Sequence, residues 1–502
     1  MHMMKNIQKA GSLLLVIVFL MSLAACGETA AETEPVETAA DTVAVEETEP
    51  ELKDNLPDLD YAGADMRVLH FGSESATLKD ALGDDAGGDI VSDAVYNRNL
   101  MVEDRLNIKF TWTPGSSDWG GYPNEVANMI LGGDCPYEMV FMESSQCFRL
   151  SLEGYFQDLM DLPYVELEQP WWYTDFMNGG SIGTDHRYYL TGAFSITTME
   201  GASAVVVNKA LFNDNFGDYN DLYDLVKENA WTYDRFAEYC AGVYNDINGN
   251  GEKDEDDIVG FANQGQRTIN YLSMSTGLPY MQRDENGIPQ LDLYNDYAIQ
   301  WVDTLYNLLY TENYAYQPKD PNAYDGTPHF AEGKALFMPG LLSGYTSTKL
   351  RDMEDPKGVV PHPVLEEGMK YVRAAGTVNG ESVVIPSTTP TELREMCGAT
   401  MEALSFEAYR LVVPAWYEVA LKSKYADAER DAEMIDVIYD TIDTSFIMMA
   451  DKLLGSGSFF YTVVGAGKID GGGYTSYYEK NIKALQTKWD NMLAAYEELI
   501  SQ

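Results

Sequence analysis

Residues 246–257, DINGNGEKDEDD, place oxygen-bearing side chains at alternate positions around two glycines. Gly251 occupies the sixth place of this twelve-residue segment, where calcium loops turn sharply. The oxygen donors stand at places one, three, five, seven (through its carbonyl), nine and twelve: Asp246, Asn248, Asn250, Glu252, Asp254 and Asp257. Hard cations take six to eight oxygen ligands of this kind, so the spacing predicts a Ca²⁺ site.

The loop differs from a calcium sensor in two ways. Its last place holds Asp257 instead of the longer glutamate, and residues 258–262 are typical of a short strand, not of a second helix. The segment therefore resembles the lone calcium loops of dockerins and some periplasmic binding proteins. Sensors use paired loops to open a groove, so we expect a structural ion here, with a polar turn after the preceding helix as the alternative.

The N-terminus indicates export from the cytoplasm. Lys5 and Lys9 precede an apolar run at residues 13–21, and the sequence Leu-Ala-Ala-Cys ends at Cys26. This ending resembles the bacterial lipobox. The resemblance implies a signal peptide at residues 1–25, diacylglycerol and palmitate on Cys26, and anchoring to the outer face of the cell membrane. An uncleaved anchor or a plain secretion signal is the alternative.

The segment after Cys26 has the composition of a disordered tether. Residues 27–51 combine Glu, Asp, Ala, Thr and Pro with no Lys, Arg or aromatic side chain, which leaves too little apolar surface to fold. We therefore expect an acidic tether at residues 26–59. The whole chain carries 80 acidic against 33 basic residues, a formal net charge of −47, which disfavours nucleic acid and other polyanions as partners.

Apolar periodicity predicts alternating strands and helices. Strands are expected at residues 66–71, 108–112, 137–142 and 204–207, and helices at residues 91–106, 125–131, 233–244, 296–310, 394–424, 431–450 and 477–500. This order predicts an α/β protein with mostly parallel sheets covered by helices. The four cysteines beyond Cys26 have no metal-binding or disulfide spacing, which indicates buried free thiols: Cys135, Cys147, Cys240 and Cys397.

Several short sequence motifs resemble, in the same order, those of the extracellular solute-binding proteins of carbohydrate ABC transporters, the group that includes maltose-binding protein. They are DAVYNRN (93–99), GYFQDL through PWW (154–172), VVNKALF (206–212), WTYD (231–234) and FAEGKALF (330–337). The chain resembles this family over most of residues 60–500. The resemblance implies an α/β, two-lobed periplasmic-binding-protein-like (type II) fold with a hinge. It also implies a monomer that passes a solute to an ABC permease without catalysis.

The resemblance also implies which segments of the chain form each lobe. Lobe 1 would comprise residues 60–194 plus about 372–430, and lobe 2 residues 195–371 plus about 431–502. The chain would cross between them near Ser195, Thr377 and Arg430. A solute that touches both lobes only in the closed form would shift the population toward that form.

A sugar cleft needs flat aromatic rings for the apolar faces of the sugar and polar groups for its hydroxyl rim. Polar candidates at strand ends and crossings are Glu143, Ser144, Ser145, Ser195 and Thr197. Aromatic candidates are Trp171, Trp172, Tyr345 and Trp416. Solvated loop acids, hinge packing and core packing are the alternatives. Since neighbouring helical positions point about 100° apart, one tryptophan of the adjacent pair is expected to pack in the core.

Tyr345 is the first aromatic residue after Gly340, where maltose-type relatives carry aromatic residues directly beyond the glycine. The identity of the solute therefore stays open, and a peptide or another non-sugar solute is an alternative. A secreted glycoside hydrolase, which needs two carboxylates about 5 to 10 Å apart, is another. A surface adhesin would require repeated modules, and the chain has no internal repeat. Zinc-protease, nucleophile-elbow and phosphate-loop motifs are absent from the sequence.

Overall fold

The computed structural model describes residues 52–84, 89–133, 135–274, 281–312, 314–315, 326–350, 352–371, 373–374, 380–421, 428–455 and 473–501. Residues Leu56–Gln502 form one compact unit, which contains both large sheets. The predicted signal peptide, Cys26 and the crossing at Thr377 lie outside the described residues. None of the described helices is both long and apolar enough to span a membrane.

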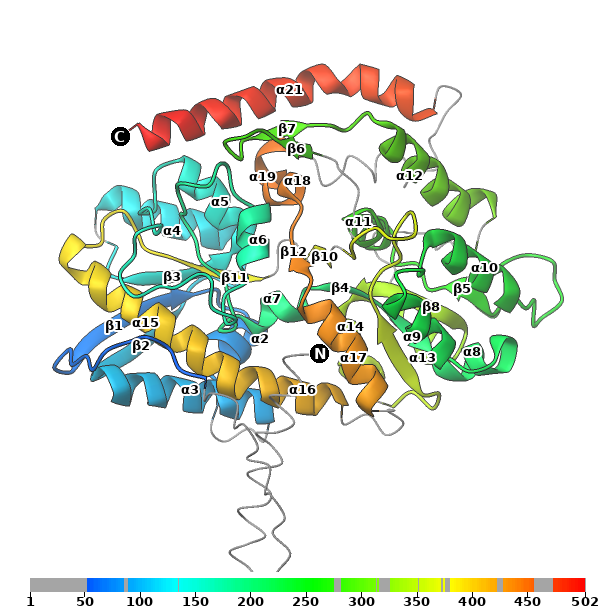
Figure 1. The fold of residues 1–502 in the computed structure, drawn as a ribbon, viewed down its shortest axis with the longest axis horizontal. Helices are drawn as coiled ribbons and strands as arrows, with labels where there is room; N and C mark the ends of the chain where they lie inside the picture. Colours follow the sequence, from blue (N-terminus) through cyan, green and yellow to red (C-terminus); the bar gives the residue numbers. More distant parts are fainter. Residues whose placement is uncertain are drawn as a thin grey trace, which may run out of the picture. The chain divides into compact units, whose positions relative to one another are not determined.

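The first four-stranded sheet has the order β11-β3-β1-β2 (Figure 1). Its strands are β1 (Ala64–His70), β2 (Ile108–Pro114), β3 (Met139–Glu143) and β11 (Glu381–Val384). Strand β1 runs parallel to β2 and β3, as the alternation of strands and helices predicts, and the three predicted strands are confirmed. Strand β11 comes from a distant part of the sequence and pairs antiparallel with β3.

Helices from the first third and from the last third of the sequence belong to the same part of the fold as this sheet. They are α3 (Ile90–Leu106), α4 (Gly121–Gly132), α5 (Ser144–Leu152), α15 (Arg394–Glu407), a π-helical turn (Ala408–Val412) and α16 (Val413–Leu421). Asp89 caps α3 by accepting a hydrogen bond from the Val91 amide, and Asn107 ends it in a left-handed conformation. Helices α15 and α16 both pack against α3. The core of this layer includes Val95, Val102 and Leu106.

The second sheet has the order β5-β8-β4-β9. Its strands are β4 (Ser203–Asn208), β5 (Val259–Phe261), β8 (Ala335–Leu341) and β9 (Lys357–Val360). Strand β4 is antiparallel to both β8 and β9, and only β5 and β8 run parallel. The expectation of a mostly parallel sheet is therefore wrong here. The neighbours of β4 come from distant segments, so no crossover helix between consecutive strands fixes their direction.

Most of the remaining helices belong to this second sheet, where α10 contacts β5, α11 contacts β8 and α17 contacts β9. Their bounds are α8 (Lys209–Phe216), α9 (Asn220–Lys227), α10 (Tyr233–Val243), α11 (Gln266–Met274), α12 (Asp296–Tyr306), α13 (Thr327–Ala331), α14 (Leu342–Tyr345) and α17 (Ala428–Tyr439). The predicted helix at 233–244 is confirmed. The helix predicted at 296–310 changes to a π-helical turn at Asn307–Thr311.

Several other elements of the described residues are short. They are α2 (Glu74–Ala76), a π-helical turn (Thr77–Ala81), α6 (Thr174–Gly179), α7 (Ile196–Glu200), β10 (Arg373–Ala374), β12 (Ile442–Asp443), α18 (Phe446–Met449) and α19 (Asp451–Leu454), with 3₁₀ turns at Thr348–Leu350 and Thr391–Leu393. Strand β12 pairs in parallel with β10.

The helix predicted at 431–450 is wrong in its second half. Helix α17 ends at Tyr439, and β12 follows it. The β-branched residues Thr441 and Ile442 favour extended backbone, and the Asp443 carboxylate accepts a hydrogen bond from the Thr444 amide, which turns the chain. Helices α18 and α19 then contact α5, a helix that follows β3 of the first sheet. The division into lobes that the resemblance implies, with about 431–502 in lobe 2, stays a prediction.

The last helix, α21 (Gly473–Ile500), contacts α12, α19 and α5, and it is drawn in red in Figure 1. A hairpin of β6 (Met281–Arg283) and β7 (Pro289–Leu291) precedes α12. Arg283 in this hairpin donates hydrogen bonds to the backbone carbonyls of Ser181 (2.8 Å) and Gly179 (2.7 Å). The hairpin is thereby tied to the end of α6.

Candidate functional site

Two buried glutamates face each other where β3 ends and β11 begins. Glu143 is the register partner of Glu381 in the antiparallel ladder. Directly opposed residues of an antiparallel pair point to the same face of the sheet, with Cβ atoms about 4.5 to 5.5 Å apart. Both side chains are more than nine-tenths buried. The sheet therefore brings two carboxyl groups together in the interior.

Glu143 has one hydroxyl and one ammonium partner. The Ser145 hydroxyl donates a hydrogen bond of 2.7 Å to Glu143 Oε1, and Lys452 Nζ of α19 lies 3.7 Å from the same oxygen. Burial raises the pKa of the Glu143 carboxyl, whereas Lys452 and Ser145 act in the opposite direction. Ser144 contacts the other strand, because its hydroxyl lies 2.8 Å from that of Ser382.

The backbone of Glu381 is held by the segment that leads from the first sheet to α7. The Glu381 amide donates to Ser195 Oγ (3.1 Å), and the Thr191 hydroxyl donates to the Glu381 carbonyl (3.1 Å). The Glu381 Oε2 atom, in contrast, is buried and makes no hydrogen bond within the described residues. Burial raises the pKa of this carboxyl well above its usual value, and the negative charges of Asp80 and Glu143 raise it further.

Asp80 is a third buried carboxylate at the same place. Its Oδ1 accepts a hydrogen bond from the Thr197 amide (3.1 Å), and its Oδ2 accepts one from the Thr197 hydroxyl. The Thr197 hydroxyl also lies 3.4 Å from the Glu381 amide. Burial raises the pKa of Asp80 to about 7, against the opposing effects of the Thr197 hydrogen bonds and Arg98. Thr197 thus links Asp80 to the backbone of β11.

Trp416 contacts the end of α7. Its indole N–H donates a hydrogen bond of 3.0 Å to Glu200 Oε1, and Lys79 Nζ lies 2.6 Å from Glu200 Oε2. Trp416 is buried between these elements. The structure therefore brings Ser195, Thr197 and Trp416 to the two ends of one short helix.

Trp171 and Trp172 both lie in the interior, although the sequence predicted that only one of the pair packs there. Their indole N–H groups donate to the two oxygens of Glu402 in α15, at 2.8 and 2.9 Å. The segment around them is irregular, so two neighbouring rings can turn toward a single carboxylate. That either ring contacts a solute stays a prediction.

Tyr345, at the end of α14, lies apart from the two glutamates. Its ring is buried, with Lys357 Nζ 5.5 Å from the ring centre, and its hydroxyl makes no hydrogen bond within the described part of the chain. Burial raises the pKa of this hydroxyl. Its predicted role in stacking on a sugar also stays a prediction.

Four residues of this region were not predicted from the sequence. Asp80 and Glu381 are the buried carboxylates described above, and the rings of Tyr173 and Tyr439 meet edge to face with centres 5.9 Å apart. Neither of the two tyrosine hydroxyls forms a hydrogen bond of ordinary geometry within the described residues, although both are buried. An acid two positions before the apolar strand residues Val383 and Val384 was the one sequence pattern that could have indicated Glu381.

The predicted calcium loop is closed by its own side chains. Asp246 accepts hydrogen bonds from the amides of Gly249 (2.6 Å) and Gly251 (2.9 Å), both of which have positive φ. Asp254 Oδ2 accepts from the side-chain amides of Asn248 (3.0 Å) and Asn250 (2.7 Å). Strand β5 follows the loop, as the sequence predicts.

Asp257 completes the loop by accepting a hydrogen bond from the Asp254 amide at 3.1 Å. Carboxylate, amide and carbonyl oxygens suit Ca²⁺, so the donor chemistry fits the ion. Among the described residues, however, no three His, Cys, Asp or Glu side chains come together as a metal-binding group. Calcium binding by Asp246, Asn248, Asn250, Glu252, Asp254 and Asp257 stays a prediction.

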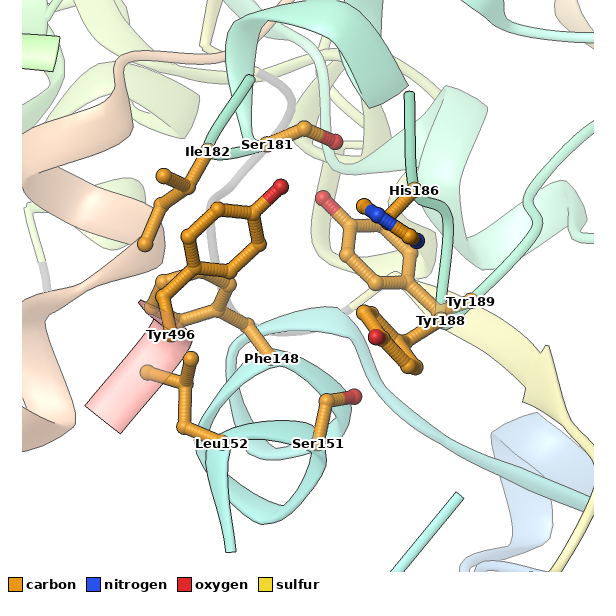
Figure 2. A pocket seen from close by; sticks show the side chains of 9 residues that line it. All are labelled: Phe148, Ser151, Leu152, Ser181, Ile182, His186, Tyr188, Tyr189 and Tyr496. Carbon is orange, nitrogen blue, oxygen red and sulfur yellow. The ribbon is translucent and has the colours of Figure 1, made fainter. Parts of the chain in front are cut away.

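A pocket lies at the other end of α5. Figure 2 shows the rings of Tyr188, Tyr189 and Tyr496 around it, with Phe148 and Leu152 of α5. The residues of α5 that line it, Phe148, Ser151 and Leu152, follow Glu143 by five to nine positions. No residue that the sequence singled out for solute binding lines it.

No protein-family model and no curated protein sequence matches the chain. Solved structures match it over most of its length. An ABC substrate-binding protein of Listeria monocytogenes, in complex with cycloalternan, is 12% identical with a TM-score of 0.53, over 87% of this chain and 99% of that one. The galacto-N-biose and lacto-N-biose I-binding protein of an ABC transporter of Bifidobacterium longum, in complex with lacto-N-biose, is 12% identical with a TM-score of 0.53, over 86% and 98%.

A third match, UgpB of Mycobacterium tuberculosis in complex with glycerophosphocholine, is 15% identical with a TM-score of 0.52, over 86% of this chain and 99% of that one. Identities this low establish the fold alone. The chain therefore has the two-lobed, type II α/β fold of ABC substrate-binding proteins, as its resemblance to the carbohydrate-binding family implied.

Proposed function

We propose that this protein is a solute-binding receptor that captures a carbohydrate and delivers it to an ABC permease. The observation that carries the proposal is the meeting of buried carboxyl and hydroxyl groups around Glu143, Glu381 and Asp80, where β3 ends beside the segment leading to α7. Open α/β sheets bind ligands at the carboxyl ends of their strands. Carboxylates and hydroxyls can bind the hydroxyl rim of a sugar, and no bond needs to be made or broken.

The fold supports this proposal, because two of the matched proteins described above are in complex with a sugar. An oligosaccharide is the solute we propose first. The glycerophosphocholine complex shows that the same fold is used for a non-sugar ligand, which keeps such a solute as the second candidate.

A melting experiment tests the proposal. A ligand that binds only the folded state stabilises it by about 2.7 kcal/mol at a hundredfold excess over Kd, so the melting temperature detects binding without knowledge of the solute. The purified protein would be melted with oligosaccharides, peptides and metabolites, and each mixture would then be separated by chromatography. A shift with one sugar class and an unchanged sugar supports the receptor. Shorter products would mean a glycoside hydrolase, and Glu143 and Glu381 would then be its first candidate carboxylates.

We further propose that Cys26 carries the lipid anchor and that the receptor acts as a monomer at the outer face of the membrane. The support is the sequence before Cys26 and the acidic composition after it. Labelling of cells with a radioactive fatty acid should mark the native protein and leave a Cys26→Ala variant unlabelled. Equal labelling of both would show that the lipid is elsewhere.

The loop at residues 246–257 is proposed to hold a structural Ca²⁺. Its oxygen donors and its place between α10 and β5 support a stabilising role away from the Glu143 region. Binding of Ca²⁺ to the folded state alone would raise the melting temperature.

A further inference from the structure

Three buried carboxyl groups are connected through one threonine and one strand pair. Thr197 donates hydrogen bonds to both oxygens of Asp80, and its hydroxyl also lies 3.4 Å from the Glu381 amide. Glu381 is in turn the register partner of Glu143. Asp80, Glu143 and Glu381 are all at least nine-tenths buried. They are therefore elements of one site and not three unrelated acids.

The basic residues near this site are already engaged by other groups. Lys452 lies 3.7 Å from Glu143, and Lys79 forms an ion pair of 2.6 Å with Glu200. Arg98, which is buried beside Asp80, donates to the backbone carbonyls of Asp80 (2.9 Å) and Phe194 (3.2 Å). Within the described residues, no Lys, Arg or His side chain forms an ion pair with Glu381. Of the three carboxyl groups, Glu381 is therefore the one with no basic side chain paired to it within the described residues.

Within the described residues, the Oε2 atom of Glu381 also lacks a hydrogen bond. The residue is 4% exposed, and its Oε2 atom has no partner in the described part of the chain. A buried carboxylate without a partner is costly, because it gives up its hydration and receives nothing in return. Its backbone cannot move away to relieve this cost, since Ser195 and Thr191 hold the amide and the carbonyl.

We propose that Glu381 binds a protonated amine of the solute, so that the solute is an amino sugar and not a neutral one. This inference rests on the proposed receptor function and names its substrate class. An ammonium group supplies both the missing positive charge and hydrogen-bond donors for the free oxygen, and charge-assisted hydrogen bonds of this kind are about twice as strong as neutral ones. Binding of the ammonium group releases the proton that the buried Glu381 carboxyl keeps in the free protein.

Titration calorimetry with matched sugars tests this inference. The probes would be pairs that differ by an ammonium group in place of a hydroxyl: the trisaccharide of β-linked glucosamine against cellotriose, glucosamine against glucose, and galactosamine against galactose. At about pH 6 the amines are protonated, and the native protein is expected to bind at least one amino sugar about tenfold or more tightly than its neutral partner. Glu381→Gln keeps the size of the side chain and is expected to abolish this preference.

Glu392→Gln is the matched control, because Glu392 is exposed in the turn at Thr391–Leu393. It is expected to bind like the native protein. The melting temperature and near-ultraviolet circular dichroism of both variants would verify that they are folded. Neutral sugars that bind as tightly as their amino partners, or a Glu381→Gln variant that keeps the preference, would overturn the inference and leave the receptor function standing. Binding of no amino sugar of the panel would also overturn the inference, and the melting experiment with the wider set of solutes would decide separately on the receptor function.

Discussion

The amide of Glu381 donates a hydrogen bond of 3.1 Å to the hydroxyl of Ser195, which lies 186 positions earlier in the chain. The same hydroxyl caps α7 by accepting from the Thr198 amide at 3.3 Å. Ser195 therefore joins β11 of the first sheet to the segment that leads to the second sheet. The resemblance to binding proteins placed a crossing of the chain at this residue.

Replacement of Ser195 by Ala should destabilise the protein. It leaves the Thr198 amide without this acceptor, at a cost of about 1 to 3 kcal/mol, and leaves the Glu381 amide with only the longer contact to the Thr197 hydroxyl. Urea denaturation would measure the loss. Thr487→Ala removes a hydroxyl that donates to the Lys483 carbonyl on the exposed face of α21, and it should change the free energy of unfolding little. Equal losses in the two variants would contradict the importance of the Ser195 contact.

Stability should fall as the pH rises through the neutral range. The folded-state pKa of Glu381 is raised well above the ordinary 4.5, first by burial and then by Asp80 and Glu143. The folded state therefore keeps a proton that the unfolded state releases. The resulting stability is present below the unfolded pKa and is lost as pH rises toward the folded pKa, by about 1.4 kcal/mol for each unit of difference.

Glu381→Gln has no proton to release, so its stability relative to the native protein should increase with pH. Urea denaturation of both proteins at several pH values measures this difference. Asp80, whose pKa burial raises to about 7, contributes a loss of the same sign in both proteins. A difference between native and variant that does not change with pH would show that Glu381 titrates in its ordinary range.

Glu402 should be important for stability because it accepts hydrogen bonds from both Trp171 and Trp172. Glu402→Ala leaves two buried indole N–H groups unpaired, which costs about 1 to 3 kcal/mol each. Glu402→Gln keeps one carbonyl acceptor and should lose less. Chemical denaturation followed by tryptophan fluorescence would compare the two variants. If Ala and Gln were equally stable, the indole hydrogen bonds would have little effect.

The calcium loop gives a separate prediction. The double variant Asp246→Ala, Asp257→Ala lacks two carboxylates of the loop. Its melting temperature should therefore be lower and should no longer depend on Ca²⁺. Affinity for the solute should stay close to that of the native protein. Asp284→Ala, in the turn of the β6–β7 hairpin, is a control for loss of an acidic turn residue. Loss of affinity without loss of stability would contradict a purely structural ion.

The sequence predicted best those helices and strands whose pattern of apolar residues lies within one continuous segment. Apolar periodicity located β1, α3, β2 and α10, and a strand followed the loop at residues 246–257 as expected. It failed at the direction of β8 and β9 relative to β4, because pairing between distant segments leaves no local pattern. It also failed beyond Tyr439, where a hydrogen bond to Asp443 and β-branched residues interrupt a helical pattern.

The candidate site was only partly visible for the same reason. Glu143 follows a predicted strand, so its place at a strand end could be inferred. Glu381 and Asp80 come close to Glu143 only through contacts between residues far apart in the sequence. Little in the sequence distinguishes them from the other acids among the 80. Trp171 and Trp172 are aromatic residues of the kind that stack on sugars, but their indole N–H groups donate hydrogen bonds to Glu402.

The most direct test of the account is the affinity of a Glu143→Ala variant for the solute found by the melting experiment. Glu143 lies at the end of β3 and has Ser145 and Lys452 as partners. Removal of its carboxylate is expected to weaken binding about tenfold or more in titration calorimetry, with a folded protein by circular dichroism. Unchanged affinity in this variant would show that the solute binds elsewhere and would contradict the site proposed here.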